Sequence, residues 1–381
     1  MTGSGAHPIT AGAEPYAFRD LAAAFDAQFD RGLHYGAQLA VWIDGSPAFA
    51  RVGGYADRAG SRPIGLRTPF MVYSVTKSIV AVAVHMLADR GALDLDAPVR
   101  DRWPGFGAKG KDGITPAHLL SHLAGIPANP GPADAVSWLA PRWSARRVEA
   151  MPLEFEPGSK CVYLAFTAHV ALGELIRRVD GRSPARFIRE EIFAPLGMAD
   201  SLAGVPVRRY REVSGIHSGD RAQDRAAATF GNPLMRSVFM PAASVNTTAT
   251  DLCRLYDALL CPRGGARKVP LSATALGRAT RKRYEGPDGD TGRLIRWSEG
   301  FTLGGLPPFP HTAILMMGKR STETTFGHAG QGGCALAWAD PETRLVFAFV
   351  CNRFLPAEEA HRRFQELSDL AWDAPGRRGT E

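Results

Sequence analysis

The sequence has few of the features expected of a secreted, disulfide-linked or membrane-spanning protein. Only five of its 381 residues are cysteines, and no two of them form a CxxC pair. Such an odd, scattered set argues against a disulfide framework and is typical of a reducing compartment. Apolar runs such as 79–84 are far too short to cross a bilayer. The first residues also lack a basic stretch followed by an apolar one, so we expect no secretory signal, no membrane partner and a cytoplasmic location.

Signals for two further classes of protein are weak or missing. No GxSxG sequence occurs, which argues against an α/β-hydrolase. The net charge is +7, but the arginines are dispersed and the cluster Arg281-Lys-Arg283 is short. Because nucleic-acid sites need a continuous basic stripe, we interpret this cluster as solvated surface and expect no nucleic-acid partner. We expect no cofactor either.

The pattern of apolar residues predicts an α+β fold. Helices and strands at both chain ends bracket a middle of short helices and many loops, and the first two strands are split by a turn at Asp44-Gly-Ser-Pro. We infer an antiparallel sheet built from both chain ends and flanked by helices, with a mainly helical domain inserted between them. The predicted helices cover 16–31, 74–91, 114–125, 165–178, 184–193, 250–260 and 357–373, and the predicted strands cover 36–43, 48–52, 334–339 and 344–351.

These elements suggest how the chain divides. Residues 15–95 and 291–381 would form the sheet domain, and 96–290 the inserted helical domain. Residues 1–14 are small and polar, so we predict a disordered tail. We expect the active site to lie between the two domains.

The sequence Ser74-Val-Thr-Lys77 carries the strongest chemical signal. It begins a long helical pattern, and a serine three residues before a lysine places both side chains on one helix face, one turn apart. A serine hydroxyl is a poor nucleophile until a neighbouring base takes its proton. The chain has seven lysines, and only Lys77 follows a serine at this spacing. An ordinary helix-capping serine and a surface lysine would give the same four letters.

A second helix is predicted over 114–125, where Thr115 can cap the start and Gly125 can end it. It carries His118 and His122, four residues apart, which is a spacing that metal sites use. No glutamate lies between them as in HExxH motifs, so we interpret the pair as structural and expect no metal.

Four segments that follow one another along the chain carry a family resemblance. Together they resemble the serine β-lactamase and penicillin-recognising superfamily over roughly residues 30–355. The branch they resemble most is that of the class C-like serine hydrolases, which contains family VIII carboxylesterases and the transacylases of natural-product pathways. The segments are Tyr73-Ser-Val-Thr-Lys77, Thr115-Pro-Ala-His-Leu-Leu-Ser-His-Leu-Ala-Gly125, Glu156-Pro-Gly-Ser-Lys-Cys-Val-Tyr163 and Phe326-Gly-His-Ala-Gly-Gln-Gly-Gly333.

The resemblance implies a set of catalytic roles. Ser74 would attack an acyl carbon, and Lys77 would accept its proton, which requires an amine that is neutral part of the time. Tyr163 would relay the proton to the leaving group. The backbone N–H groups of Ser74 and Gln331 would form the oxyanion hole.

Two positions depart from the β-lactamase pattern. The second motif usually reads Tyr-x-Asn, whereas Ala165 stands in place of the asparagine that binds the substrate's amide. The third motif usually begins with lysine, whereas this chain has His328, followed by Ala and then Gly330. A histidine is mostly neutral at pH 7 and anchors a carboxylate less well. We therefore expect Ala165, His328 and Gly330 to line the site, and β-lactamase activity to be weak or absent.

Four aromatic residues lie in loop-rich parts of the chain, namely Trp138, Trp143, Phe239 and Trp297. They could wall an acyl pocket, but packing in the core or on the surface explains each of them equally well.

We predict a serine hydrolase or acyltransferase that works through an acyl ester on Ser74. Its acyl donor would be a small-molecule ester or amide. Water as the acceptor would make it a carboxylesterase, and an amine or alcohol would make it a transacylase. Two other classes stay open at this point. One is a hydrolase of amides or D-amino-acid peptides, or a weak β-lactamase, and the other is a non-catalytic binding protein of the same fold.

Overall fold

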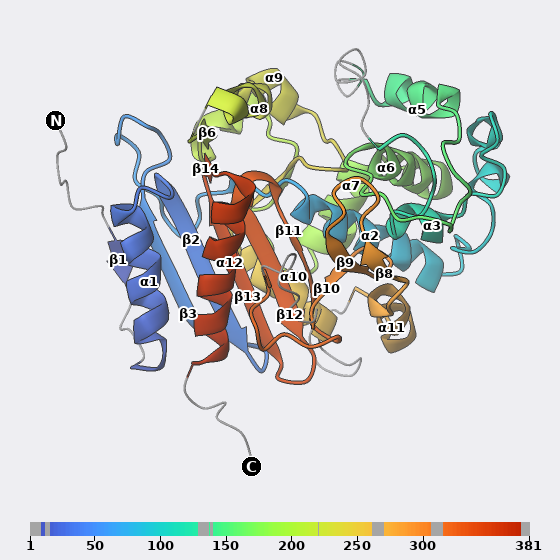
Figure 1. Cartoon of the computed structure of the whole chain (residues 1–381). Helices are drawn as coiled ribbons and strands as arrows, with labels where there is room; N and C mark the ends of the chain where they lie inside the picture. The colour runs from blue at the N-terminus through green and yellow to red at the C-terminus, as the bar shows by residue number, and fades with distance from the viewer. Residues whose placement is uncertain are drawn as a thin grey trace.

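A nine-stranded sheet, antiparallel throughout, forms the core of the protein (Figure 1). The computed structural model describes residues 9–11, 16–128, 137, 140–219, 221–260, 270–305 and 315–374. Both chain ends contribute strands, which confirms the predicted α+β architecture. Across the sheet the strands are β1 (Ile9–Ala11), β3 (Ser46–Gly54), β2 (Gly36–Ile43), β13 (Leu345–Cys351), β12 (Ala335–Asp340), β11 (Phe326–Ala329), β10 (Thr302–Leu303), β9 (Leu294–Trp297) and β8 (Tyr284–Pro287).

The predicted hairpin between β2 and β3 is present. Asp44 and Gly45 both have positive φ angles, 48° and 77°. Two such residues in succession are what a tight hairpin turn needs to match the twist of the strands, and Asp-Gly is a favoured pair for it.

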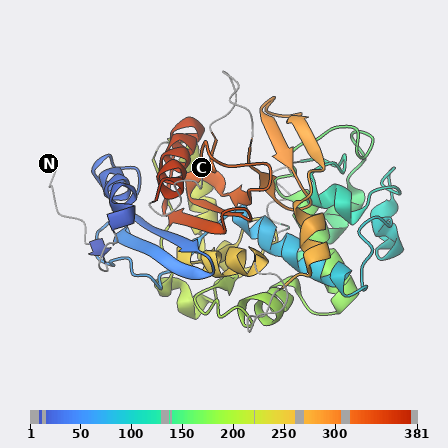
Figure 2. The same cartoon turned by 90° about the horizontal axis from the view of Figure 1, so that it is seen from below.

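Helices cover both faces of the sheet (Figures 1 and 2). On one face α1 (Arg19–Asp30) and α12 (Ala357–Trp372) lie against each other and against β3 and β13. On the other face α10 (Ala249–Leu260) packs on β2, β12 and β13, and α2 (Val75–Asp89) packs on β11 and β12.

The side chains of the central strands explain this arrangement, because successive residues of a strand point to opposite faces. Trp338 of β12 and Phe347 of β13 join the cluster formed with α1 and α12. Ala337 and Ala348 point to the opposite face and join the cluster formed with α2 and α10. The small residues therefore let α2 and α10 approach the sheet closely.

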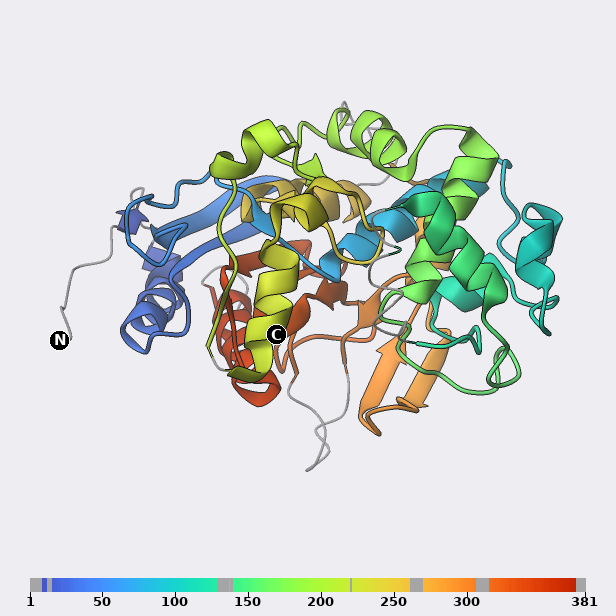
Figure 3. The ribbon, with the colours of Figure 1, turned by 90° about the horizontal axis from the view of Figure 1, so that it is seen from above.

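Helix α2 is buried on all sides, which is unusual for a helix of a globular protein. It lies between the sheet and α6, α7 and α11. The run from Ile79 to Val84 has no exposed surface. Burying each of these isoleucine and valine side chains contributes roughly 1.5–3 kcal/mol. Figure 3 shows α2, in light blue, between the sheet and the green helices of the helical part of the molecule.

The helical part of the molecule lies beside the sheet (Figures 1 and 3). Its helices are α3 (Pro116–Leu120), α5 (Pro141–Ala150), α6 (Thr167–Asp180), α7 (Pro184–Ile188), continued by a π-helical turn over Arg189–Phe193, α8 (Arg221–Gly231), α9 (Pro233–Ser237) and α11 (Ala273–Thr280). Two small sheets complete the structure: β4 (Phe70–Met71), β7 (Val245–Thr247) and β5 (Leu202–Ala203) form one, and β6 (His217–Ser218) and β14 (Arg353–Phe354) form the other.

The structure corrects the predicted division of the chain in three places. Residues 9–11, predicted as part of a disordered tail over 1–14, form β1 and pair with Gly53, Val52 and Arg51 of β3. The rest of that tail lies outside the described residues. Two elements of the predicted insert, α10 and β8, instead pack on or join the main sheet. Helix α10 packs on β2, β12 and β13, and β8 pairs with β9. The order of elements along the chain does not reveal these long-range contacts.

The structure describes four of the five cysteines and the helices that were expected not to span a membrane. Cys161, Cys253, Cys334 and Cys351 are buried free thiols, and the fifth cysteine, Cys261, lies outside the described residues. In the described part of the chain, every helix is too short or too polar to span a bilayer.

Candidate active site

Ser74 lies at the start of α2, where the chain leaves the short strand β4. Its neighbour Tyr73 has a φ angle of 47°, which a bulky residue rarely adopts and which costs on the order of 1–3 kcal/mol. The Tyr73 ring is buried against Phe230 and Phe354, and this packing holds the strained turn. Ser74 occupies the N-cap position, but its side chain makes no capping hydrogen bond. The hydroxyl is therefore free for other partners, unlike that of an ordinary capping serine.

Lys77 lies one turn further along α2 and is 1% exposed. Its Nζ donates to Ser74 Oγ at 2.9 Å and to the carbonyl of Ala242 at 2.9 Å. Burial in an apolar surrounding disfavours the charged ammonium and lowers the pKa of Lys77 to about 7. The amine is thus present in both protonation states near neutral pH, which a surface lysine is not.

Tyr163 reaches the same hydroxyl from the loop that precedes α6. Its hydroxyl donates to Ser74 Oγ at 2.8 Å, and its ring centroid lies 5.2 Å from Lys77 Nζ. Burial raises the pKa of the Tyr163 phenol well above its usual value of 10.0, while the hydrogen bond to Ser74 opposes the shift. The three residues predicted to be catalytic are therefore brought together around one oxygen atom.

The loop around Tyr163 is held by two residues that the sequence did not single out for this role. The backbone N–H of Val162 donates to the carbonyl of His122 at 3.1 Å, and that of Leu164 donates to His122 Nδ1 at 3.1 Å. Between them, the N–H of Tyr163 donates to Asp288 Oδ2 at 2.9 Å. Three successive backbone amides thus bond to groups from two distant segments.

The placement of His122 corrects the prediction of one helix over 114–125. Thr115 does cap α3 and exchanges hydrogen bonds with His118, but the helix ends at Leu120. His122 follows with a φ angle of 61°, and its Nδ1 accepts a hydrogen bond, so it does not lie on one helix face with His118. The described residues contain no cluster of three or more His, Cys, Asp or Glu side chains that could bind a metal ion.

Aromatic rings surround Tyr163. The Trp297 ring, at the end of β9, stacks on the Tyr163 ring at 5.8 Å, and the His122 ring lies 4.8 Å from it. Of the four aromatic residues considered as pocket walls, Trp297 alone has such a contact among the described residues. Trp143 is 45% exposed, Phe239 packs on the main core, and Trp138 lies outside the described residues.

The third motif lies on β11 and the turn that follows it. His328 is buried, and its Nδ1 donates to the carbonyl of Ala329 at 2.9 Å. Burial, helped by the nearby Lys77, lowers the pKa of His328 to about 3, so the ring is neutral at physiological pH. The ring centroid of His328 lies 6.4 Å from that of Tyr163, so it is close to the three residues at Ser74.

Gly330 brings this turn close to the strand before Ser74. A Cβ added at Gly330 would lie 2.8 Å from the carbonyl oxygen of Val72, so a larger residue would push the two segments apart. The next residue, Gln331, is exposed and begins a short 3₁₀ turn over Gln331–Gly333. Within the described residues, no acceptor is found for the backbone N–H of Ser74 or of Gln331. Ala165, half-buried, follows Tyr163 by two residues and provides no polar side chain.

One stretch of sequence imitates a nucleotide-binding loop. Gly105-Phe-Gly-Ala-Lys-Gly110 has the spacing GxGxxG, and Lys111 follows it. The stretch begins in a 3₁₀ turn rather than after a strand, and no helix begins at its end, so it lacks the context that a dinucleotide site needs. The Lys111 amine is buried and bonds to the carbonyls of Ala108, Glu149 and Met151. It therefore stabilises a turn instead of facing a phosphate.

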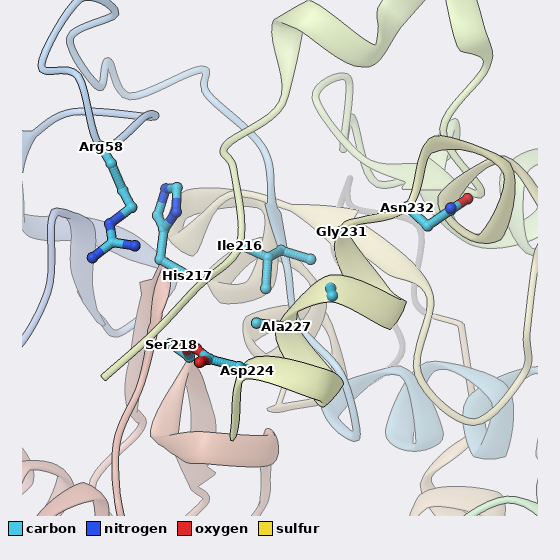
Figure 4. Close-up of a pocket in the computed structure, with 9 residues that line it drawn as sticks. Arg58, Ile216, His217, Ser218, Asp224, Ala227, Gly231 and Asn232 are labelled. Carbon is cyan, nitrogen blue, oxygen red and sulfur yellow. Dashed lines mark hydrogen bonds between the residues drawn. The ribbon is translucent and has the colours of Figure 1, made fainter. Parts of the chain in front are cut away.

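A pocket of about 350 Å³ lies away from these residues (Figure 4). Arg58 and His217 lie on one side of it, and Ser218 bonds to Asp224 at its base. None of the predicted site residues lines it. Its walls are formed by Arg58, Ile216, His217, Ser218, Asp224, Ala227, Ala228, Gly231 and Asn232.

Comparison with known proteins identifies the family. A family model described as Beta-lactamase matches residues 21–371. The chain belongs to the beta-lactamase family. This result confirms the resemblance drawn from the four sequence motifs.

Curated proteins similar to this chain include two that are named esterases. The esterase/beta-lactamase LipL of Mycobacterium tuberculosis is 30% identical over 376 residues, which cover 90% of this chain and 83% of that protein. Esterase EstB of Burkholderia gladioli is 35% identical over 201 residues, which cover 47% of this chain and 51% of EstB.

Solved structures similar to this chain include a penicillin-binding protein homologue and a carboxylesterase. A penicillin-binding protein homologue from Caulobacter crescentus matches with a TM-score of 0.81 at 30% identity, covering 96% of this chain and 100% of the homologue. A family VIII carboxylesterase matches with a TM-score of 0.79 at 27% identity, covering 95% and 99% of the two chains. The family and these neighbours point to a serine hydrolase of the β-lactamase fold.

Proposed function

We propose that this protein is a carboxylesterase that forms an acyl ester on Ser74. The observation that carries the proposal is the position of Ser74 Oγ, which accepts hydrogen bonds from Lys77 Nζ at 2.9 Å and from the Tyr163 hydroxyl at 2.8 Å. A nucleophile, a base and a proton donor within hydrogen-bond reach are the groups that acyl transfer requires.

The pKa shifts separate the roles of the two partners. Lys77, whose pKa is lowered to about 7, is the group that can accept a proton at neutral pH. Tyr163, whose pKa is raised, holds its proton and can give it away. Groups whose surroundings push their pKa values apart act as base and acid in this way.

In the acylation step the neutral Lys77 amine takes the hydroxyl proton while Ser74 Oγ bonds to the acyl carbon. Tyr163 donates its proton to the oxygen of the leaving alcohol as the ester bond breaks, and the Lys77 ammonium restores the proton to Tyr163. The backbone N–H groups of Ser74 and Gln331 bind the oxyanion. Each such donor contributes about 10²–10³ in rate in hydrolases of this kind.

In the second step water attacks the acyl-enzyme. Lys77, neutral again, accepts a proton from the water, directly or through Tyr163. The carbon–oxygen bond to Ser74 breaks, and Ser74 Oγ recovers a proton from Lys77. The carboxylic acid then leaves.

The charge of the site indicates the class of acyl donor. His328 is neutral, with a pKa of about 3, so it offers no cation to a substrate carboxylate. Ala165 offers no amide group. A β-lactam or a peptide ending in D-alanine needs recognition of both kinds, whereas an uncharged ester needs neither. We infer that the substrates are small, uncharged esters.

Transfer of the acyl group to an alcohol or amine is a second candidate. The half-buried Tyr163 ring, stacked on the buried Trp297, offers an apolar edge beside Ser74, on which an organic acceptor could bind in place of water.

Turnover of three substrate classes tests the proposal: p-nitrophenyl acetate and butyrate, nitrocefin, and a D-alanyl-D-alanine peptide. Ester hydrolysis at least about 100-fold above the other two, and lost in Ser74→Ala, is the expected result. A preference for the peptide would identify an amidase. No turnover of any substrate, with equal labelling of wild type and Ser74→Ala by a serine-reactive fluorophosphonate, would identify a non-catalytic binding protein. Added ethanol or a primary amine, with the ester or amide product measured, separates acyl transfer from hydrolysis.

A further inference from the structure

The loop that carries Tyr163 has no regular secondary structure. The Tyr163 hydroxyl must nevertheless be placed precisely enough to reach Ser74 Oγ. The loop lies between a turn over 156–159 and the start of α6 at Thr167. A displacement of about 1 Å at a catalytic group can lower a rate about 100-fold. Something outside the loop therefore has to fix it.

His122 accepts two of the three hydrogen bonds that the successive backbone amides of residues 162–164 donate. Its carbonyl accepts from the N–H of Val162, and its Nδ1 accepts from the N–H of Leu164. These two amides flank Tyr163, so His122 holds the backbone on both sides of the catalytic residue. The His122 ring also lies 4.8 Å from the Tyr163 ring and 4.6 Å from the Trp297 ring.

The backbone of His122 is adapted to this task at a cost. Its φ angle of 61° lies in the left-handed region, where histidine is uncommon. This conformation ends α3 early and turns both acceptors of His122 toward the loop. Strained residues of this kind persist when the surrounding contacts determine them, and they gather at functional sites.

The protonation state of His122 fits an acceptor. The ring is 1% exposed, and burial lowers the pKa of His122 well below its usual value, with the positive charge of Lys77 acting in the same direction. The ring is therefore neutral, and because Nδ1 accepts from Leu164, the proton is on Nε2.

We propose that His122 is a positioning residue for catalysis: it fixes the backbone on both sides of Tyr163, while Asp288 holds the amide of Tyr163 itself. Asp288 is suited to its part because it is 3% exposed, and its other oxygen accepts from the turn residues Asp290 and Thr291. The proposal rests on the proposed function, in which Tyr163 donates the proton to the leaving group.

A double-mutant cycle with ethyl butyrate, whose alkoxide leaving group has to be protonated, tests the proposal in the full-length protein. His122→Ala should lower kcat about 10- to 100-fold and leave KM nearly unchanged, since the substrate groups are not touched. In the Tyr163→Phe background the same substitution should lower kcat by less than about threefold, because His122 acts through the hydroxyl that is already missing. An equal loss in both backgrounds would overturn the proposal and leave His122 a general structural residue.

Two further variants keep the test decisive if His122→Ala folds poorly. Asparagine tolerates the left-handed conformation and presents an acceptor oxygen close to the position of Nδ1, so His122→Asn should restore most of kcat. Glutamine places that oxygen one carbon further away and should not. If His122→Asn is as impaired as His122→Gln, the acceptor role is refuted. His118→Ala is the matched control, because His118 bonds to Thr115 on the same segment and should change the melting temperature without changing kcat.

Amide hydrogen exchange separates this proposal from the proposed function. The amide hydrogen of Leu164 should exchange faster in His122→Ala than in wild type, and its exchange rate should return to the wild-type value in His122→Asn. This order is expected whether or not the protein hydrolyses esters. If exchange follows this order but wild type has no Ser74-dependent turnover, the proposed function fails and the positioning contact stands. If wild type is active and exchange at Leu164 does not respond, the positioning proposal alone fails.

Discussion

The two halves of the active site are built in different ways. Ser74 and Lys77 lie one turn apart on a single buried helix, so local helix geometry sets their contact. The backbone amides of Leu164 and Tyr163 donate to acceptors 42 and 125 positions away in the chain, at His122 and Asp288. Packing of distant segments therefore sets the second half.

The difference teaches which changes each half can survive. Helix α2 is enclosed by the sheet and three helices. If one residue that packs on α2 is substituted, many other contacts still hold the helix in place. The Tyr163 loop is held by a few single hydrogen bonds: three donated by the amides of residues 162–164, and one that the Cys161 carbonyl accepts from the N–H of Gly289. We expect substitutions in residues that hold the Tyr163 loop to lower activity even where those residues do not contact the substrate. In the serine half, we expect a comparable loss only when Ser74 or Lys77 is itself substituted.

Removing the nucleophile should have the largest effect. Ser74→Ala should lower kcat for p-nitrophenyl butyrate by about 10⁴-fold or more, because no other group can form the acyl ester. The melting temperature should stay nearly unchanged, since the Ser74 side chain does not cap the helix. Steady-state kinetics and thermal unfolding measure both. Ser78→Ala is the control on the same helix, because Ser78 bonds to the Gly300 carbonyl and not to the site. A large loss of stability in Ser74→Ala would show that the residue is structural.

Removing the proton donor should have a smaller effect. With an alkyl ester such as ethyl butyrate, Tyr163→Phe should lower kcat about 10²- to 10³-fold, which is the size of a general acid contribution, and leave the ring stacking on Trp297 intact. Tyr284→Phe removes a hydroxyl that bonds to the Pro287 carbonyl and should leave kcat unchanged. Activity of Tyr163→Phe within a few fold of wild type would assign the proton transfer to another group.

The local half of the site could be predicted from the sequence, and the contacts with distant segments that hold the other half could not. The spacing of Ser74 and Lys77 is visible in the printed letters, and so is the alternation that builds β12 and β13. His122 looked like a residue of an uninterrupted helix, because nothing in its neighbours signals a φ angle of 61°. Asp288, in Pro287-Asp-Gly-Asp, looks like an ordinary turn residue, and its bond to Tyr163 depends on a hairpin docking beside the helical part. Only the folded chain brings these together.

The pH dependence sharpens the comparison, because one half titrates near neutrality and the other does not. Lys77 must be neutral to act as a base, and its pKa is about 7. We expect kcat/KM to rise about tenfold per pH unit below that value and to level off above it. The histidines around the site stay neutral across this range because burial lowers their pKa values, so His328→Asn should not move the inflection. An inflection near pH 10 would mean that Lys77 is solvated and not the base.

The smallest effect is expected from restoring one recognition group of β-lactamases. His328→Lys should leave nitrocefin turnover close to the wild-type level, since Ala165 still provides no amide and the new ammonium would be buried. The double variant with Ala165→Asn is the comparison that should show a gain. Appreciable nitrocefin hydrolysis by His328→Lys alone would show that the site recognises carboxylates through a single cation.

The most direct test is the intact mass of the protein when the reaction with p-nitrophenyl acetate at neutral pH is quenched with acid within seconds of mixing. We predict a mass increase of one acetyl group that peptide mapping places on Ser74 and that is absent in Ser74→Ala. An acetyl group on another residue, or an equal adduct in wild type and Ser74→Ala, would contradict it.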